Sequence, residues 1–303
     1  MIVIIGSVNM DLVLRVPRMP MPGETLAGDK FMTIPGGKGA NQAVACARLA
    51  APGTAVAMVA CVGDDAFGAQ MRQSITACGI DDRYLDEVAG EATGIASIMV
   101  DANAQNSIVI AAGANGRLDV ERIERARPLI EQASIVLLQL EVPNPTVIHA
   151  IELAHSLGKT VVLNPAPAQA LPRELLQKVD YLILNEIEAA MLAEERAVAN
   201  SDDIPQLAAR LHALGARNVV VTLGEKGVYG AFADGRQGHL PARKVQAVDT
   251  TAAGDTFIGG FIGAIAQGRD PFDAIAYAQA AAALSVTRIG AQTSIPTRDE
   301  VVL

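Results

Sequence analysis

A short stretch of the chain, residues 249–257, combines small residues with two carboxylates and reads Asp-Thr-Thr-Ala-Ala-Gly-Asp-Thr-Phe. Its small residues at 252–254 allow the main chain to approach a ligand closely. Apolar residues at helical spacing follow Asp255, which predicts a helix that begins at about 253–255 and whose free N–H groups attract an anion such as phosphate. An Asp in a first turn commonly caps a helix, but the motifs described next favour a functional role for Asp255.

A second segment, residues 36–42, is rich in glycine and reads Gly-Gly-Lys-Gly-Ala-Asn-Gln. It differs from the phosphate loop of P-loop proteins, because Lys38 is followed by Gly rather than by Ser or Thr. Glycines before a predicted helix let the backbone reach a ligand, and Lys38 and Asn41 supply hydrogen-bond donors. The segment is therefore either part of a binding site or a glycine hinge.

Three acidic or amide side chains are suited to the hydroxyl groups of a sugar. Asn9 and Asp11 are two residues apart in an extended segment, so their side chains point to the same side. The pair could bind two neighbouring hydroxyl groups, or it could belong to a turn. Glu141, which follows a predicted strand, adds another acceptor.

Two further segments favour a nucleotide and its metal ion. Asn185 and Glu188 follow a predicted strand, and Glu188 could hold hydrated Mg²⁺, which keeps several waters and takes few protein carboxylates. Glu188 could also be an ordinary residue of a surface helix. Residues 222–227, Thr-Leu-Gly-Glu-Lys-Gly, form a turn against which a nucleotide could lie. The sequence contains no hydrolase nucleophile elbow, and its His residues are interpreted as structural.

The elements that must position these residues follow from the hydrophobic pattern. Six short apolar runs predict strands that are covered on both faces, and amphipathic segments between most of them predict helices. This alternation predicts a doubly wound, mostly parallel α/β sheet, whose ligands bind at the carboxyl ends of the strands. Strands are expected at 2–5, 56–62, 135–140, 161–163, 181–184 and 219–223, and helices at 40–49, 67–78, 146–157, 204–214, from about 253, and from 271 to about 287.

Residues 11–36 and 94–112 interrupt this pattern with β-rich segments and turn residues. They predict a small antiparallel sheet inserted into the body, which comprises residues 1–10, 37–93 and 113–303. The inserted sheet is expected to act as a lid over the site, and a pair of surface hairpins is the alternative.

The predicted lid has an apolar face that needs a cover. A few short strands are marginally stable alone, and an exposed apolar face is a docking surface. Sugar and the body would cover part of it when the lid closes, and the lid of a second subunit would cover the rest, which predicts a two-fold homodimer. The residues expected on this face are Ile95, Ile98, Val100, Ile108 and Ile110.

Composition excludes several classes of function. The net charge of −9 and the lack of a basic stripe argue against nucleic acid as the main partner. Three cysteines without metal-ligand spacing indicate reduced thiols. The first apolar run is too short for the core of a secretory signal, and no stretch reaches membrane-spanning length, so we expect a cytoplasmic protein.

Taken together and in this order, the motifs resemble those of the ribokinase family of carbohydrate kinases, also called the PfkB family. The resemblance covers essentially the whole chain, and residues 249–255 are its most specific part. It also rests on residues 6–11, 35–41, 63–65, 112–115, 164–167, 185–188 and 290–292.

The resemblance implies a role for each of these groups in phosphoryl transfer to a sugar. Asp255 would take the proton from the sugar hydroxyl. An anion hole for the γ-phosphate would be formed by the backbone N–H groups of Ala252, Ala253 and Gly254. The pentose would be held by Asn9, Asp11, Gly37, Lys38, Asn41 and Glu141, together with Asp255.

The resemblance also implies a nucleotide site and two metal sites. Glu188 would help to place Mg²⁺ through water. ATP would contact Asn185, Thr222, Gly224, Gly227 and Gln279. K⁺ would be surrounded, largely through backbone carbonyls, by Asp249, Thr251, Ser285, Arg288, Gly290 and Ser294.

Two residues depart from the family pattern. Met10 is bulkier than expected between Asn9 and Asp11, which bears on the shape of the sugar pocket, and Gln279 stands where a His or Asn is expected near the adenine. The expected function is ATP-dependent phosphorylation of D-ribose at its 5-hydroxyl. The alternatives are a related kinase acting on deoxyribose, a ketohexose or a nucleoside, or a non-catalytic sugar-binding regulator, which would be expected to lack Asp255 or the Ala-Gly run.

Overall fold

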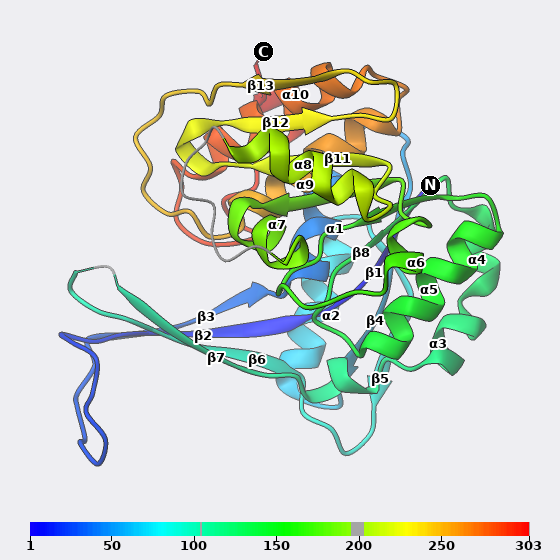
Figure 1. Cartoon of the computed structure of the whole chain (residues 1–303). Helices are drawn as coiled ribbons and strands as arrows, with labels where there is room; N and C mark the ends of the chain where they lie inside the picture. Colours follow the sequence, from blue (N-terminus) through cyan, green and yellow to red (C-terminus); the bar gives the residue numbers. More distant parts are fainter. Residues whose placement is uncertain (104, 195–202, 303) are drawn as a thin grey trace.

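The computed structural model describes residues 1–103, 105–194 and 203–302. Its body is a nine-stranded sheet with helices on both faces, and a separate four-stranded sheet projects away from it (Figure 1). Across the body sheet the strands lie in the order β13 (Gln237–Leu240), β12 (Val228–Ala231), β11 (Asn218–Thr222), β10 (Tyr181–Asn185), β9 (Thr160–Leu163), β8 (Ile135–Leu138), β1 (Ile2–Ile5), β4 (Val56–Gly63) and β5 (Asp81–Val88).

The helices form two layers, each with its own apolar core. In β1, Ile2 and Ile4 pack into one core, and Val3 and Ile5 pack into the other, because successive side chains of a strand point to opposite faces. The first core holds α1 (Lys38–Leu49), α2 (Ala66–Ala77), α9 (Ala253–Ile265) and α10 (Pro271–Ser285). The second holds α3 (Val120–Arg125), α4 (Arg127–Gln132), α5 (Asn144–Ser156), α6 (Arg173–Leu176), α7 (Glu186–Leu192) and α8 (Ile204–Ala213).

All six predicted apolar runs are strands of the body sheet, although β8 ends at Leu138 rather than at 140. The predicted α/β class is thus confirmed. The sequence analysis missed β5, β12 and β13. Only one residue of β5, Leu85, is buried, and most of the others are charged, while β12 and β13 form an antiparallel hairpin at the other edge. The edge strands β5 and β13 lack the two-sided burial that produces an apolar run, and β12 is buried but has only four residues, one of them glycine.

The strand order reverses at one point in the sheet. From β1 the chain builds outward through β4 to β5, and then returns to build β8, β9, β10 and β11 on the other side. The segments after β1 and after β8 therefore leave neighbouring strands at the same edge. In open α/β sheets the ligand crevice lies at this switch point.

The smaller sheet has the strand order β3 (Lys30–Gly36), β2 (Asn9–Arg15), β6 (Gly94–Val100) and β7 (Asn106–Ala111). The prediction that it is antiparallel is wrong for its central pair, because β2 and β6 are parallel. Both strands run outward from the body, one after β1 and the other after β5, and each returns through its own hairpin. β2 begins at Asn9, two residues before the expected start of the inserted segment.

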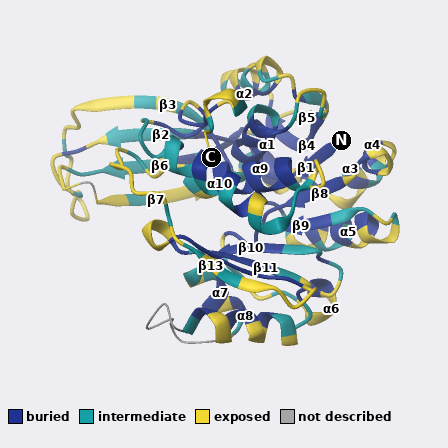
Figure 2. Cartoon of the chain, turned by 90° about the horizontal axis from the view of Figure 1, so that it is seen from above, coloured by how far each residue is buried: buried dark blue, intermediate teal, exposed yellow. Residues whose placement is uncertain are grey.

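One face of this sheet carries Asp11 together with exposed apolar side chains. The pairing register aligns Val13, Ile98 and Ile108 across three strands, and Ile108 and Ile110 are each 52% exposed. The expectation that Ile95 belongs to this face is wrong. Ile95 and Ile98 are an odd number of residues apart, so Ile95 points to the opposite face and packs against the body. Figure 2 shows the contrast between the buried body strands and the more exposed sheet.

Helices α1 and α9 pack unusually closely. A Cβ atom added to Gly259 would lie 2.3 Å from the Cβ of Ala45, so only glycine, which has no Cβ, fits at this position. Gly259 is one turn after Asp255, and Ala45 is one turn after Asn41. The close contact therefore brings the first turns of both helices, and the polar residues they carry, to the same place.

In the part of the chain that the structure describes, no helix is both long and apolar enough to cross a membrane. The three cysteines are free thiols, in agreement with the prediction of reduced side chains. Burial raises the pKa of Cys46 to about 12, which makes this thiol unreactive.

Candidate active site

Asp255 lies in the first turn of α9, as predicted, and its side chain is buried. The helix begins after Ala252, whose φ of 58° lies in the left-handed region. The N–H and the hydroxyl of Thr256 both donate to the carbonyl of Ala252, at 2.8 Å each. These bonds fix the turn that presents the Asp255 carboxylate.

The three residues predicted to form an anion hole line one pocket together with Asp255. A side chain added at Gly254 would meet no atom within 4 Å, so the surface is open to a ligand there. The N–H of Ala253 donates to the carbonyl of Thr250 at 3.2 Å within the preceding turn. The remaining N–H groups of the first turn have no acceptor within the helix, and they give this end of the pocket a partial positive charge.

Two amide side chains of α1 hold the carboxylate of Asp255. Nδ2 of Asn41 donates to Oδ2 at 3.1 Å, and Nε2 of Gln42 donates to Oδ1 at 2.9 Å. Oδ1 of Asn41 is buried and has no partner among the described residues. A buried polar atom without a partner is rare, and it fits a site that a hydroxyl group completes.

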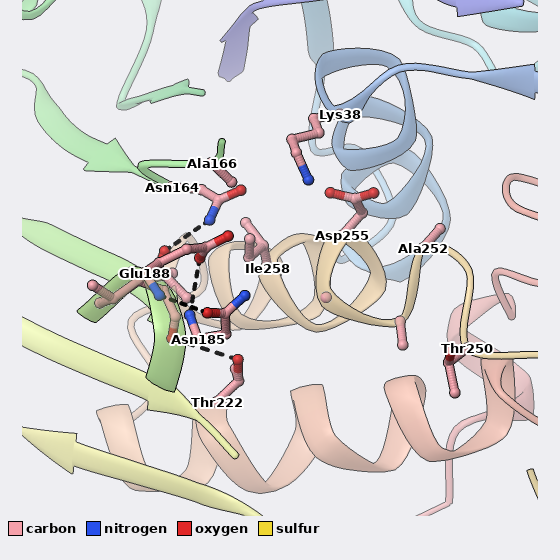
Figure 3. Close-up of a pocket in the computed structure, with 14 residues that line it drawn as sticks. Lys38, Asn164, Ala166, Asn185, Glu188, Thr222, Thr250, Ala252, Asp255 and Ile258 are labelled. Carbon is pink, nitrogen blue, oxygen red and sulfur yellow. Dashed lines mark hydrogen bonds between the residues drawn. The ribbon is translucent and has the colours of Figure 1, made fainter. Parts of the chain in front are cut away.

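Lys38 is the cation of the site. Figure 3 shows its side chain reaching from α1 toward the Asp255 carboxylate. Burial acts to lower the pKa of Lys38, but the negative charges of Asp255, Glu141 and Glu188 prevail and raise it above its ordinary value. Lys38 is therefore charged at neutral pH and balances three carboxylates.

The carboxyl group of Asp11 lies over Gly36, where an added Cβ would be 2.3 Å from its Oδ2. Burial, assisted by the negative charges of Glu141 and Asp255, raises the pKa of Asp11 to about 7. The influence of both carboxylates shows that the inserted sheet brings Asp11 to the site in the body.

Glu141 follows β8 and is tied to the segment after β1, across the switch point. Its Oε2 accepts from the hydroxyl of Ser7 at 2.5 Å and from the N–H of Lys38 at 3.1 Å. Gly37 precedes α1 with a φ of 88°, and a Cβ there would lie 2.7 Å from the backbone nitrogen of Asn9. Only glycine therefore allows this close packing of the loops that carry Glu141, Lys38 and Asn9.

On the other side of the pocket, Asn185 and Glu188 form a capping box at the start of α7. Oδ1 of Asn185 accepts from the N–H of Glu188 at 2.8 Å, and Oε2 of Glu188 accepts from the N–H of Asn185 at 3.0 Å. Burial raises the pKa of Glu188. Both residues line the pocket that Asp255 also lines.

This pocket has a volume of about 170 Å³, and of the residues predicted to hold the sugar only Lys38 and Asp255 line it. Thr222, at the end of β11, lines it, whereas Gly224, Gly227 and Gln279 do not. Gly227 has a φ of 111° and packs against the segment after β13, and Nε2 of Gln279 donates to the carbonyl of Leu240 in β13 at 3.2 Å. Gly227 and Gln279 thus lie beside the end of β13, and Gly224 lies in the turn between β11 and β12.

The residues present offer few oxygen ligands to Mg²⁺. Among the described residues, no three His, Cys, Asp or Glu side chains form a cluster that could hold a metal ion. One oxygen of Glu188 is engaged by the cap of α7, which leaves a single carboxylate oxygen. Such a site fits Mg²⁺ that keeps its waters and binds the phosphates of a nucleotide.

The two loops predicted to hold K⁺ are joined through Asp249. Its carboxylate accepts from the N–H (2.9 Å) and hydroxyl (2.6 Å) of Thr251 and from the N–H of Gly290 at 2.9 Å. Although burial acts to raise it, these bonds lower the pKa of Asp249, so the group stays charged. The bonds also brace the loop immediately before Asp255.

The other side chains of the predicted K⁺ site are already engaged. The hydroxyl groups of Ser285 and Ser294 donate to carbonyls of their own turns, at 2.9 and 2.8 Å. Arg288 forms an ion pair with Glu300 at 2.6 Å. Backbone carbonyls are the groups that the family resemblance implies for a cation, and the two Ser hydroxyl oxygens also keep lone pairs that could face one.

Four polar residues hold the site together although the sequence analysis assigned them no role: Ser7, Gln42, Asn115 and Asn164. Each is buried in the interior, and each lies within one of the sequence motifs, at residues 6–11, 36–42, 112–115 and 164–167. A polar residue within a motif was the available signal, but its partners lie up to 213 residues away in the chain.

A buried carboxylate at a helix start, set between a polar cluster and an open pocket on a doubly wound sheet, defines a phosphotransferase type of site. A sequence profile of pfkB family carbohydrate kinases matches residues 1–298. The chain therefore belongs to the PfkB family of carbohydrate kinases.

Known relatives are similar over nearly the full length of the chain. A ribokinase from Haemophilus influenzae is 44% identical over 99% of this chain and 96% of that protein. A deoxyribokinase from Salmonella typhi is 41% identical, with the same coverage of 99% and 96%. A solved structure of Arabidopsis thaliana ribokinase complexed with ribose and ATP is 33% identical, covers 99% of this chain and 96% of that chain, and has a TM-score of 0.90.

Proposed function

We propose that this chain is an ATP-dependent kinase that phosphorylates D-ribose at its 5-hydroxyl. One observation carries the proposal: the Asp255 carboxylate stands at the junction of a polar cluster suited to a sugar and a pocket at a helix N-terminus suited to phosphate. Ribokinases among the relatives, and the relative that holds ribose and ATP, support it.

The proposed reaction needs positioning, charge neutralisation and a base. Asn9, Asp11 and Lys38 hold the sugar hydroxyl groups, together with Gly37, Asn41 and Glu141. Asp255 accepts the proton of the 5-hydroxyl group while the oxygen of that hydroxyl group bonds to the γ-phosphorus. The bond from that phosphorus to the bridging oxygen breaks, and ADP leaves.

The phosphate groups are proposed to lie against the first turn of α9, where Ala252 and Gly254 offer backbone N–H groups and Ala253 would exchange its bond to the carbonyl of Thr250 for one to phosphate. The rest of the nucleotide would lie along Asn185, Thr222 and the hairpin, reaching Gly224, Gly227 and Gln279. Mg²⁺, held near Glu188 through water, supplies charge neutralisation of the β- and γ-phosphates when bound.

A monovalent cation is part of the proposal. K⁺ would bind between the loop at Asp249 and Thr251 and the segment from Ser285 to Ser294, which includes Arg288 and Gly290. The bonds from Asp249 to both loops support this position. Its role is to keep the turn before Asp255 in place rather than to touch the substrates.

We also propose that the small sheet acts as a lid and that two chains form a homodimer through their lids. The face that carries Asp11 also presents Ile98, Ile108 and Ile110, which are half-exposed or partly covered in one chain. A second lid would cover them. A cytoplasmic location, proposed from the cysteine content, accompanies this function.

The experiment that tests the function is a panel of acceptors assayed with ATP by ADP release. The panel contains D-ribose, 2-deoxy-D-ribose, D-fructose and adenosine. The highest kcat/KM is expected for D-ribose. The 41% identity to a deoxyribokinase makes 2-deoxy-D-ribose the second candidate, and a higher kcat/KM for it would replace ribose in the proposal. Sugar binding without ADP release from any acceptor would favour the regulator.

A further inference from the structure

Gln42 is a fully buried glutamine that contacts Asp255 from behind, on the side of α1. Its Nε2 donates to Oδ1 of Asp255 at 2.9 Å and to Oδ1 of Asn164 at 3.0 Å. Its Oε1 accepts from Nε2 of Gln139 at 2.6 Å. Every polar atom of this amide is thus used, in the interior of the protein, within a row of side chains that ends at Asp255.

The direction of these bonds is fixed by the main chain. Nδ2 of Asn164 donates to the carbonyl of Ile183 at 3.0 Å (Figure 3), and a carbonyl can only accept. Oδ1 of Asn164 must therefore face Gln42 and accept from it. The NH₂ group of Gln42 has two hydrogens, so one goes to Asn164 and the other goes to Asp255.

The two oxygens of Asp255 consequently differ. Oδ1 faces a donor that cannot be reversed, because reversing Gln42 would set two oxygens against each other at Asn164. Oδ2 faces Asn41, whose own Oδ1 lacks a partner among the described residues, so that amide is free to turn when a sugar hydroxyl arrives. A proton on Oδ1 would always face the NH₂ group of Gln42, whereas a proton on Oδ2 would face the NH₂ group of Asn41 only until that amide turns.

We propose that Gln42, anchored through Asn164 to the carbonyl of Ile183, is a positioning residue that reserves Oδ1 of Asp255 as an acceptor and leaves Oδ2 to take the proton from the sugar. This inference rests on the proposed kinase function. Gln42 does not touch the substrate in this arrangement. It fixes the plane of the Asp255 carboxylate, so its loss affects kcat more than the binding of either substrate.

Two variants of nearly unchanged size test the proposal. Gln42→Met removes the donor, and we expect kcat to fall by roughly ten- to a hundredfold, the cost of a misplaced catalytic group, with less than a threefold change in KM for ribose and for ATP. Gln42→Glu restores a donor only when the new carboxyl group is protonated. Its kcat is therefore expected to have an optimum at a lower pH than that of the parent.

Gln139→Met is the matched control. It removes a buried glutamine of the same row but leaves both donor bonds of Gln42 in place. It is expected to lower the melting temperature while kcat and its pH optimum stay close to those of the parent. If Gln42→Met fails to fold, the pH profile of Gln42→Glu decides alone.

Several results would overturn the proposal. One is a Gln42→Met variant whose kcat stays within threefold of that of the parent. Another is a Gln42→Met variant in which both KM values rise in proportion to the loss of kcat. The third is a Gln42→Glu variant whose pH optimum is unchanged. The activity of the parent chain distinguishes a failure of this inference from a failure of the proposed function. If the parent uses another sugar, the same comparison is made with that sugar. A parent without activity on any acceptor removes the function and the inference together.

Discussion

Nδ2 of Asn115 lies 2.7 Å from Oδ1 of Asn9, and this contact determines which end of the Asn9 amide can face a sugar. Asn115 cannot be reversed, because its amide pairs in both directions with the backbone of Val8, accepting from the N–H at 2.8 Å and donating to the carbonyl at 3.0 Å. Oδ1 of Asn9 is therefore occupied, and its NH₂ group is the end left for a ligand.

Replacing that NH₂ group by an oxygen should weaken sugar binding selectively. Asn9→Asp keeps the acceptor for Asn115 but presents a carboxylate oxygen close to Asp11. A lost hydrogen bond in a buried site costs about 1–3 kcal/mol, so KM for ribose should rise roughly ten- to a hundredfold while KM for ATP changes little. Steady-state kinetics with each substrate varied in turn measures both. Equal changes in the two KM values would indicate a folding defect instead.

Asp255→Asn tests the base. The amide can keep an oxygen toward Gln42 and an NH₂ group in place of Oδ2, so the site stays intact but cannot take the proton. We expect kcat to fall by about 10²–10⁴-fold, with KM for both substrates nearly unchanged. Retention of more than about a tenth of the parental kcat would show that Asp255 is not the base.

Asp11 should make the folded state less stable as the pH rises, whereas a carboxyl group with a lowered pKa makes it more stable. Its pKa is raised from 3.8 to about 7 in the folded chain. The folded state holds a proton that the unfolded state has released, so this group lowers stability as the pH rises from about 4 to about 7. Asp11→Asn should melt with the parent near pH 4 and several degrees higher at about pH 8, while its ribose affinity falls.

An exposed carboxylate of the same lid supplies the control for this prediction. Asp29→Asn removes the same charge from an exposed position, and its melting temperature should follow that of the parent at every pH. Thermal melts without sugar, recorded across this pH range, compare the three proteins. If the difference in melting temperature between Asp11→Asn and the parent does not grow with pH, the surroundings of Asp11 do not disfavour its charged form.

Monovalent cations should activate the enzyme. At constant ionic strength, K⁺ is expected to raise kcat, and Na⁺ to be less effective, because the cation braces the turn that leads to Asp255. Asp249→Ala should remove the response. Asp234→Ala, which changes an exposed carboxylate paired with Arg236, should retain it. Full activity of the parent in buffers without K⁺, Cs⁺ or NH₄⁺ contradicts the cation site.

The lid surface predicts the oligomeric state. Ile98 and Ile108 face each other on adjacent strands, so charged substitutions at both place like charges in the proposed interface. Ile98→Asp with Ile108→Asp should give monomers with weaker ribose binding, seen by light scattering at micromolar concentration. Val109→Asp, at a residue that is 65% exposed on the opposite face, should leave the dimer intact. A parent chain that scatters only as a 31.5 kDa species contradicts the dimer.

The sequence by itself determined the body of the fold. Strands such as β1 and β4 are buried on both faces, and they must be continuous apolar runs, which are readable one residue at a time. The helix start at Asp255 and the glycines at 36–37 are equally local, because a turn or a close approach restricts the residue type at the position itself. These local signals were enough to indicate a kinase and its acidic, amide and lysine residues.

The tertiary structure decided what no local pattern contains. The parallel pairing of β2 with β6 depends on where both strands leave the body, and the side of the lid on which Ile95 lies depends on the register. The bonds from Gln42 to Asp255 and from Asn115 to Asn9 join residues more than 100 positions apart. The sequence does not show what a buried amide binds, and only the packing of α1 against α9 shows that Gln42 donates to one oxygen of Asp255.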